Sequence, residues 1–253
     1  MIIRKSRAEL EIMDRCNRLV WEVLQELAEK AKPGVRTLEL DRHADRRARE
    51  AGARSAFKGY RGFPASLCVS VNDEIVHGIP SERRLEEGDI VSLDFGVFMD
   101  GYYGDAALTV PIGEVSPEAK KLLQVTRQAL EQAIQAARPG NHLGDVSWEV
   151  QDCVERNGFS VVREFVGHGI GGALHEEPQV PNYGKPGLGP RLEPGVVLAI
   201  EPMVNVGSPE VLIDADQWTA RTADHSLSAH FERSVAVTAE GPWVLGEPEQ
   251  VRA

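Results

Sequence analysis

The chain repeats two of its own segments, and this repeat restricts its possible folds more than any other feature. Residues 31–34 (AKPG) return as residues 137–140 (ARPG), and residues 85–94 (LEEGDIVSLD) return as residues 192–201 (LEPGVVLAIE). In both copies, the longer segment contains an apolar run and ends in an acid. Self-similarity at a fixed interval indicates a duplicated structural unit.

A His-Gly-Ile triplet lies between the two landmarks in each copy, at His77 and at His168. The agreement of these landmarks predicts two helix-helix-strand-strand halves, residues 6–115 and 116–245, packed about a pseudo-twofold axis. We therefore expect residues 1–253 to form one domain. A cleft between the halves is the expected place for a functional site.

Helix signals precede the strands in each half. Apolar residues recur every three or four positions over residues 6–31, and Ser6 is a suitable N-cap. A second helix is predicted over residues 37–52, with Thr37 as its cap. In the second half, residues 116–137 begin with Ser-Pro-Glu, which supplies a cap, a first-turn proline and a first-turn acid.

The stretch 90–110 (IVSLDFGVFMDGYYGDAALTV) predicts two strands joined at Asp100-Gly101. Asp-Gly between β-branched and aromatic residues is the strongest short-range signal for a two-residue hairpin loop. With that loop, Met99 lies opposite Tyr102, and this pair sets the register of the whole hairpin.

The predicted register brings two acids together. Asp105 lies opposite Gly96, and Asp94 is two residues from Gly96, so both aspartates point to one face as diagonal neighbours. Like charges this close raise each other's pKa or require a cation between them, and a divalent metal is the common solution. A three-residue loop would instead put Asp105 on the other face, and two solvated aspartates at strand ends are the plain alternative.

Composition restricts the class of partner. The 253 residues are 42% hydrophobic and 26% charged, which suits a globular chain with a real core. The net charge of −11 argues against nucleic acid as the main partner, because phosphate binding needs a basic surface. Three scattered cysteines are too few for a disulfide framework or a cysteine zinc site. The sequence has no signal-peptide pattern and no apolar run of membrane-spanning length, so we expect a soluble, cytoplasmic protein.

The second half carries acids at positions where burial is expected. Glu201 ends the apolar run 196–200 and precedes a proline, and Glu232 begins an alternating strand. The repeat also places Glu201 where Asp94 stands in the first half. An acid at a buried position is costly unless a cation or hydrogen bonds compensate it.

Four carboxylates and one imidazole make up the candidate ligand set, namely Asp94, Asp105, His168, Glu201 and Glu232. Taken singly, each has an ordinary structural explanation. Taken together, they suit two divalent metals bridged by carboxylates, because hard oxygen ligands outnumber nitrogen and no thiolate is needed. A metal pair lowers the pKa of water and polarises a carbonyl or phosphoryl oxygen, so hydrolysis is the expected chemistry.

Six segments turn this ligand set into a specific pattern. SLDFG, GYYGDAALT, GHGIG, LHEEP, IEPM and HFERSVAVT, in this order and spacing, resemble the metal-binding segments of the type I methionine aminopeptidases. The resemblance spans residues 6–244. It implies the α+β pita-bread fold of that family, with two pseudo-twofold-related halves, a central antiparallel sheet and outer helices. It also implies the short, bacterial-type form.

The resemblance assigns roles to the ligand set. Asp105 and Glu232 would bridge two divalent ions. Asp94 would chelate one of the ions, and His168 and Glu201 would complete the other site. Glu201 would also accept a proton from the attacking water. Co²⁺, Mn²⁺, Fe²⁺ and Zn²⁺ are all suitable, because oxygen-rich sites with one histidine accept each of them.

The resemblance also implies a substrate site. His77 and His175 match the family's two non-ligand histidines, which contact the substrate amide and stabilise the developing oxyanion. The expected methionine pocket is soft and aromatic, which suits a flexible thioether, and its walls are Tyr60, Phe63, Cys68, Leu174 and Trp218. Leu174 stands where some members have Phe. Without the resemblance, these residues would be interpreted as core or loop packing.

The expected function is removal of the initiator methionine from nascent peptides by a metal-dependent exopeptidase that prefers a small second residue. Asn72 and Ser228 match positions that hold a monovalent cation in some relatives. The alternatives are a proline-specific aminopeptidase of the same fold and a pita-bread binding protein without metals. We expect a monomer with no membrane partner and leave a transient ribosome contact open.

Overall fold

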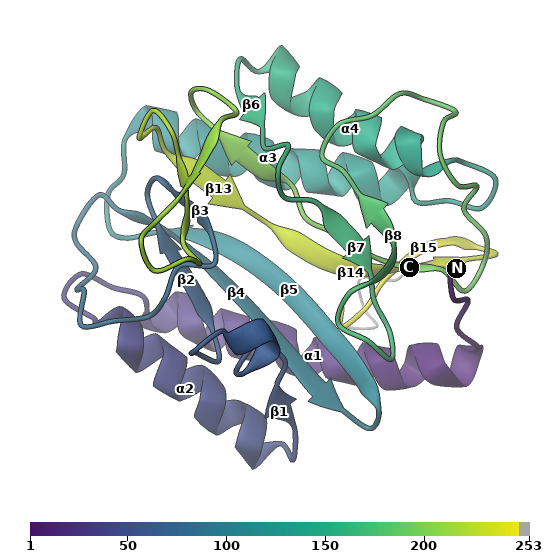
Figure 1. The fold of residues 1–253 in the computed structure, drawn as a ribbon, viewed down its shortest axis with the longest axis horizontal. Helices are drawn as coiled ribbons and strands as arrows, with labels where there is room; N and C mark the ends of the chain where they lie inside the picture. Colours follow the sequence, from purple (N-terminus) through teal and green to yellow (C-terminus); the bar gives the residue numbers. More distant parts are fainter. Residues whose placement is uncertain (248–253) are drawn as a thin grey trace.

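The computed structural model describes residues 1–247 and shows helices packed against a twisted sheet (Figure 1). Residues 248–253 of the expected domain lie outside the described part of the chain. The helices within residues 1–247 are α1 (Arg7–Lys30), α2 (Thr37–Glu50), α3 (Pro117–Ala136) and α4 (Leu143–Arg156), with a 3₁₀ turn, η1, at Tyr60–Gly62. None of these described helices combines the length and the apolar character that crossing a membrane requires.

The predicted helix starts are confirmed, with one shift. Ser6 caps α1, because its side chain accepts from the Glu9 N–H while the Glu9 carboxylate accepts from the Ser6 N–H at 2.6 Å. Ser116 caps α3. Thr37, expected as the cap of α2, is instead its first residue, and Arg36 stands at the cap position. The Thr37 hydroxyl donates to a loop carbonyl at 3.1 Å, so the helix begins without a side-chain cap.

The main sheet joins strands that lie far apart in the sequence. Its order is β1-β4-β5-β14-β9-β7-β8, with β2 paired to β4 and β15 paired to β14, and neighbouring strands run antiparallel. The strand bounds are β1 (Arg54–Ser55), β2 (Cys68–Val71), β4 (Ile90–Met99), β5 (Tyr102–Pro111), β7 (Gly167–Gly169), β8 (Glu176–Val180), β9 (Val197–Ile200), β14 (Glu232–Thr238) and β15 (Gly241–Val244).

Two small sheets of three strands each accompany the main sheet. The first has the order β13-β10-β6 and consists of β6 (Ser160–Val161), β10 (Met203–Asn205) and β13 (Ser228–His230). The second has the order β11-β12-β3 and consists of β3 (Glu74–Val76), β11 (Val211–Ile213) and β12 (Ala220–Thr222).

Strands β4 and β5 form the predicted hairpin. Asp100 and Gly101 make its loop, and both have a positive φ, 53° and 88°, as a type I′ turn requires. Met99 pairs with Tyr102. The register predicted from the sequence is therefore confirmed, and the three-residue loop is excluded.

The hairpin turns one face toward the helices and leaves the other for a site. Leu93, Phe95 and Val97 are buried in the same cluster as Leu24 of α1, which packs on β4 and β5 (Figure 1). Side chains alternate along a strand, so Asp94 points to the opposite face. The core thus lies between the helices and the sheet, and the acids lie on the sheet face away from α1.

Candidate active site

Three carboxylates share one face of the main sheet because of the strand register. In the β4–β5 pair, Gly96 is opposite Asp105 and Asp94 is opposite Ala107. In the β5–β14 pair, Ala107 is opposite Glu232. Residues directly opposite in antiparallel strands project to one face, as do residues two apart in one strand. Asp94, Asp105 and Glu232 therefore project together.

Two further strands bring the other candidate ligands to this face. Strand β9 pairs with β14 in a register that, continued one residue beyond β9, places Glu201 opposite Glu232. In the next strand, β7, His168 is opposite Ala199, which precedes Glu201 by two residues. Five neighbouring strands, β4, β5, β14, β9 and β7, thus each carry one candidate ligand within the strand or directly after it.

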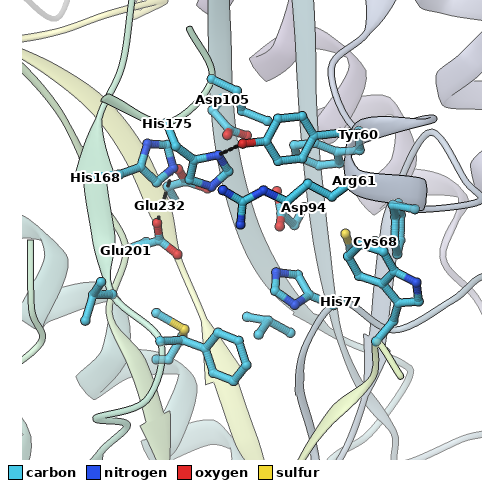
Figure 2. A pocket seen from close by; sticks show the side chains of 18 of the residues that line it. Tyr60, Arg61, Cys68, His77, Asp94, Asp105, His168, His175, Glu201 and Glu232 are labelled. Carbon is cyan, nitrogen blue, oxygen red and sulfur yellow. Dashed lines mark hydrogen bonds and ion pairs between the residues drawn. The ribbon is translucent and has the colours of Figure 1, made fainter. Parts of the chain in front are cut away.

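The donor atoms of these side chains converge (Figure 2). One ligand atom each of Asp105, His168 and Glu232 lies within 4.8 Å of the other two. Nε2 of His168 is 3.6 Å from Oε1 of Glu201. Nδ1 of His168 donates to the Gly169 carbonyl oxygen at 2.9 Å, and burial lowers the pKa of His168 to about 3. The ring is therefore neutral, and the lone pair of Nε2 faces the carboxylates.

Burial dominates the electrostatics of the four carboxyl groups. It raises the pKa of Asp94 to about 7 and that of Glu201 to about 8. Burial and neighbouring carboxylates raise the pKa values of Asp105 and Glu232 well above their usual range. One buried oxygen of each of Asp94, Asp105 and Glu232 has no hydrogen-bond partner among the described residues. Divalent metal ions fit this donor set, because they compensate buried negative charge and prefer hard oxygen ligands.

Two neutral histidines accompany the carboxylates. The Tyr60 hydroxyl is 2.9 Å from Nδ1 of His175, and the two rings stack with centroids 5.3 Å apart (Figure 2). Burial lowers the pKa of His175 and, with neighbouring histidines, lowers the pKa of His77 to about 4. A neutral His175 that accepts from Tyr60 at Nδ1 carries its proton on Nε2. It can therefore donate a hydrogen bond without bearing a charge.

The histidines and the carboxylates line one pocket of about 300 Å³. Its lining includes every residue predicted for the substrate site, namely Tyr60, Phe63, Cys68, His77, Leu174, His175 and Trp218. Phe63 and Trp218 meet edge to face with ring centroids 5.2 Å apart. Cys68 pairs with Asp94 across β2 and β4, and burial raises the pKa of its thiol, which stays neutral. The pocket joins an aromatic wall to a sheet face that carries four carboxyl groups.

Both the sequence and the fold match known proteins. Residues 11–239 match the model of metallopeptidase family M24. The chain is 52% identical over 241 residues to methionine aminopeptidase 1 of Bacillus subtilis, and the match covers 95% of this chain and 97% of that one. This chain belongs to the methionine aminopeptidase family. The crystal structure of methionine aminopeptidase from Thermotoga maritima matches with a TM-score of 0.96 and 44% identity, covering 98% of this chain and 100% of that chain.

The pita-bread fold expected from the sequence is confirmed by this likeness within the family. The Xaa-Pro dipeptidase from Bacillus anthracis also matches, with a TM-score of 0.77 and 23% identity, over 97% of this chain and 62% of that chain. At that identity the two proteins share the fold alone.

Seven residues line the pocket that were not predicted from the sequence, namely Phe57, Arg61, Val76, Glu164, Phe165, Val166 and Met203. Some had an available signal, because Arg61 follows Tyr60 in a glycine-rich aromatic loop and Met203 ends the IEPM segment. Phe165 meets His77 edge to face at 5.3 Å. Nothing local in the sequence indicates that contact, because it joins residues far apart in the chain.

His230 is a further histidine of the site that sequence reasoning missed. Its Nε2 is 3.6 Å from Oε2 of Glu201, and neither buried ring nitrogen has a hydrogen-bond partner among the described residues. Burial lowers the pKa of His230, so the ring is neutral. The available signal was its spacing, because it precedes Glu232 by two residues in an apolar segment.

Asn72 and Ser228, the positions expected near a monovalent cation, are adjacent. The Ser228 N–H donates to the Asn72 carbonyl oxygen at 2.8 Å. The Asn72 side chain is engaged elsewhere, because its amide donates to Asp89 at 2.8 Å and its oxygen accepts from the Ile90 N–H at 3.0 Å. A cation at this place would therefore rely on backbone carbonyl oxygens and the Ser228 hydroxyl.

Proposed function

We propose that this protein removes the N-terminal initiator methionine from nascent polypeptides and prefers a small second residue. The pocket carries the proposal, because an aromatic wall suited to a thioether adjoins four carboxylates and a histidine. The relatives that match nearly the whole chain are named for this activity. The protein is accordingly a metal-dependent exopeptidase, which is a class of hydrolase.

The convergence of the five side chains on one sheet face supports their assignment as the metal ligands. Asp105 and Glu232 would hold both of two divalent ions, and Asp94 would hold one of them. His168 and Glu201 would hold the other. Co²⁺, Mn²⁺, Fe²⁺ or Zn²⁺ suits this donor set. When bound, such a pair lowers the pKa of water and polarises the substrate carbonyl.

Glu201 accepts a proton from the attacking water. Its position supports this role, because one carboxylate oxygen faces His168 and the other faces His230, each at 3.6 Å. A general base acts only when it is held within hydrogen-bond reach of the proton that it takes. The carboxylate thus lies between two imidazoles, on the sheet face that carries the other candidate ligands.

His175 donates its Nε2 proton to the oxyanion that develops on the scissile carbonyl, and His77 contacts the substrate amide. The contact between the Tyr60 hydroxyl and Nδ1 of His175 supports the first role, because a hydroxyl that donates to Nδ1 leaves the ring proton on Nε2. A preformed donor of this kind stabilises the charge that appears in the transition state.

The unbranched methionine side chain enters the aromatic part of the pocket, against Tyr60, Phe63, Cys68, Leu174 and Trp218. We further propose a monomeric, cytoplasmic enzyme with two duplicated halves, residues 6–115 and 116–245, and a monovalent cation near Asn72 and Ser228. Its main partner is the nascent peptide, which it meets through a transient contact with the ribosome. The net charge of −11 supports a partner other than nucleic acid.

The test is methionine release from Met-Ala-Ser, Ala-Ala-Ser and Met-Lys-Ser by chelated protein, with and without added Co²⁺ or Mn²⁺. Metal-dependent cleavage of Met-Ala-Ser alone supports the proposal. Cleavage of Xaa-Pro peptides in its place would favour the proline-specific alternative. Failure to bind metal at all would favour a binding protein of the same fold.

A further inference from the structure

Arg61 is the one arginine or lysine among the described residues that line the pocket. It lies in the turn Tyr60–Gly62, its guanidinium points into the pocket, and it lies 5.5 Å from the centroid of the Tyr60 ring (Figure 2). Its φ is +49°, a conformation that costs free energy for any residue other than glycine. A strained turn that directs a charge into a pocket points to a role in binding.

The Arg61 guanidinium lacks an anionic partner within residues 1–247. It makes no hydrogen bond or ion pair there, and its contact with Tyr60 is through the ring face. Glu164 lines the same pocket but is not within ion-pair distance of Arg61. The planar guanidinium presents paired N–H donors that match a carboxylate in geometry and charge. The substrate is the remaining source of such a carboxylate.

The place of Arg61 beside His175 indicates which part of the substrate it reaches. The guanidinium lies over the Tyr60 ring, and the Tyr60 hydroxyl is 2.9 Å from Nδ1 of His175. In the proposed function, His175 acts at the first peptide bond and the second residue is small. An extended peptide continues past the second residue at about 3.3 Å per residue, so the third residue is the first that can carry a long side chain toward the guanidinium.

We propose that Arg61 determines specificity by binding a carboxylate on the third residue of the substrate, so that peptides with Glu or Asp at that position are preferred. This inference rests on the proposed function. Arg61 is exposed, so the effect of its pair with a carboxylate is modest. We expect a preference of about threefold to fivefold in kcat/KM.

The test compares three peptides with amidated C-termini, Met-Ala-Glu-Gly, Met-Ala-Gln-Gly and Met-Ala-Lys-Gly, turned over by metal-loaded enzyme at low ionic strength. Amidation removes the terminal carboxylate, so the peptides differ in charge at the third residue alone. The expected order of kcat/KM is Glu, then Gln, then Lys. Added salt should narrow the differences, because it screens an exposed pair. Arg61→Gln should bring the Glu-to-Gln ratio to about 1, and Arg61→Glu should favour Lys over Glu.

Two further variants separate Arg61 from the general charge of the protein. Arg163 also lies over a tyrosine, 4.8 Å from the Tyr183 ring centroid, but outside the pocket. Arg163→Gln removes the same charge and should leave the ratio between peptides unchanged. Glu164→Gln removes the opposing charge of the pocket wall, and the Glu preference should persist in it.

Three results would overturn the inference and still leave methionine release intact. The first is equal kcat/KM for the three peptides with the unaltered enzyme. The second is a Glu preference that survives Arg61→Gln, and the third is a Glu preference that is lost equally in Arg163→Gln. Absence of methionine release from every peptide would instead overturn the proposed function.

Discussion

Lys5 and Glu176 form an ion pair whose side chains are only 3% and 7% exposed, and this pair ties the segment before α1 to the residue directly after His175. Lys5 Nζ also donates to the Ile3 carbonyl oxygen at 3.2 Å. The Glu176 carboxylate accepts from the Ala173 N–H at 3.2 Å. The pair therefore holds the turn that carries His175 against the start of the chain.

Lys5→Met should lower the free energy of unfolding by about 3–5 kcal/mol, because it leaves the Glu176 carboxylate buried without a counter-charge. The double change Lys5→Met with Glu176→Gln should recover most of that loss. Urea denaturation of the three proteins measures both effects. Arg4→Met is the matched control, since its pair with Glu193 is exposed and should contribute at most about 1 kcal/mol. A loss in Lys5→Met no larger than that of the control would contradict the prediction.

Added Mn²⁺ or Co²⁺ should raise the melting temperature of the chelated protein, because a ligand that binds only the folded state stabilises it. The gain is about 2.7 kcal/mol at a free concentration one hundred times the Kd. Asp105→Asn and Glu232→Gln should lose this response and the peptidase activity while the protein still folds. Glu131→Gln, an exposed change on α3, should respond like the unaltered chain. A full metal response in Glu232→Gln would refute its assignment as a bridging ligand.

His175→Ala should reduce kcat by about 10²–10³-fold with a much smaller change in KM, because it removes a donor used in the transition state. Tyr60→Phe should reduce kcat less, since it frees the tautomer of His175 but keeps the stacked ring. Steady-state kinetics on Met-Ala-Ser separates the two parameters. If only KM changes in His175→Ala, the residue binds substrate and does not stabilise the oxyanion.

The metal-free protein should become less stable as the pH rises from 7 to 9. Folding raises the pKa of Asp94 to about 7 and that of Glu201 to about 8, against about 4 in the unfolded chain. The buried histidines of the site have lowered pKa values and act in the opposite direction, but only near and below their unfolded pKa of about 6.5. Above pH 7 the folded state therefore holds carboxyl protons that the unfolded state has released, and stability is lost as the pH passes 7 and 8. Urea midpoints of the chelated protein measure the slope, which Glu201→Gln should reduce. An unchanged midpoint from pH 7 to pH 9 would contradict the assigned shifts.

Local signals made part of the site predictable. The Asp100-Gly101 loop and the alternation of side chains were enough to place Asp94 and Asp105 on one face, and the structure confirms that register. Ser6 and Ser116 were identified as caps because a capping residue acts on its own first turn. Thr37 was wrong by one position, because its hydroxyl is used by a loop that the local pattern does not reveal.

Other contacts of the site could not be predicted, even where a residue had a local signal. His230 beside Glu201 and Lys5 beside Glu176 each join segments that are distant in the chain or on different strands. In the sequence, Arg61 looks like any other cation in a loop. Only the structure shows that its turn directs it into the pocket. Contacts of this kind depend on which surfaces pack together, and a short sequence window does not contain that information.

The sequence by itself determined the hairpin, its register and the kinds of donor atom, because turn chemistry and two-residue alternation act over a few neighbouring residues. Only the tertiary structure decided that β14 lies beside β5 and that β9 and β7 follow it. That order brings Glu232, Glu201 and His168 to the two aspartates. Strands so far apart in the chain pair because the whole sheet is buried against the helices. The sequence of a single strand does not determine which strand lies beside it.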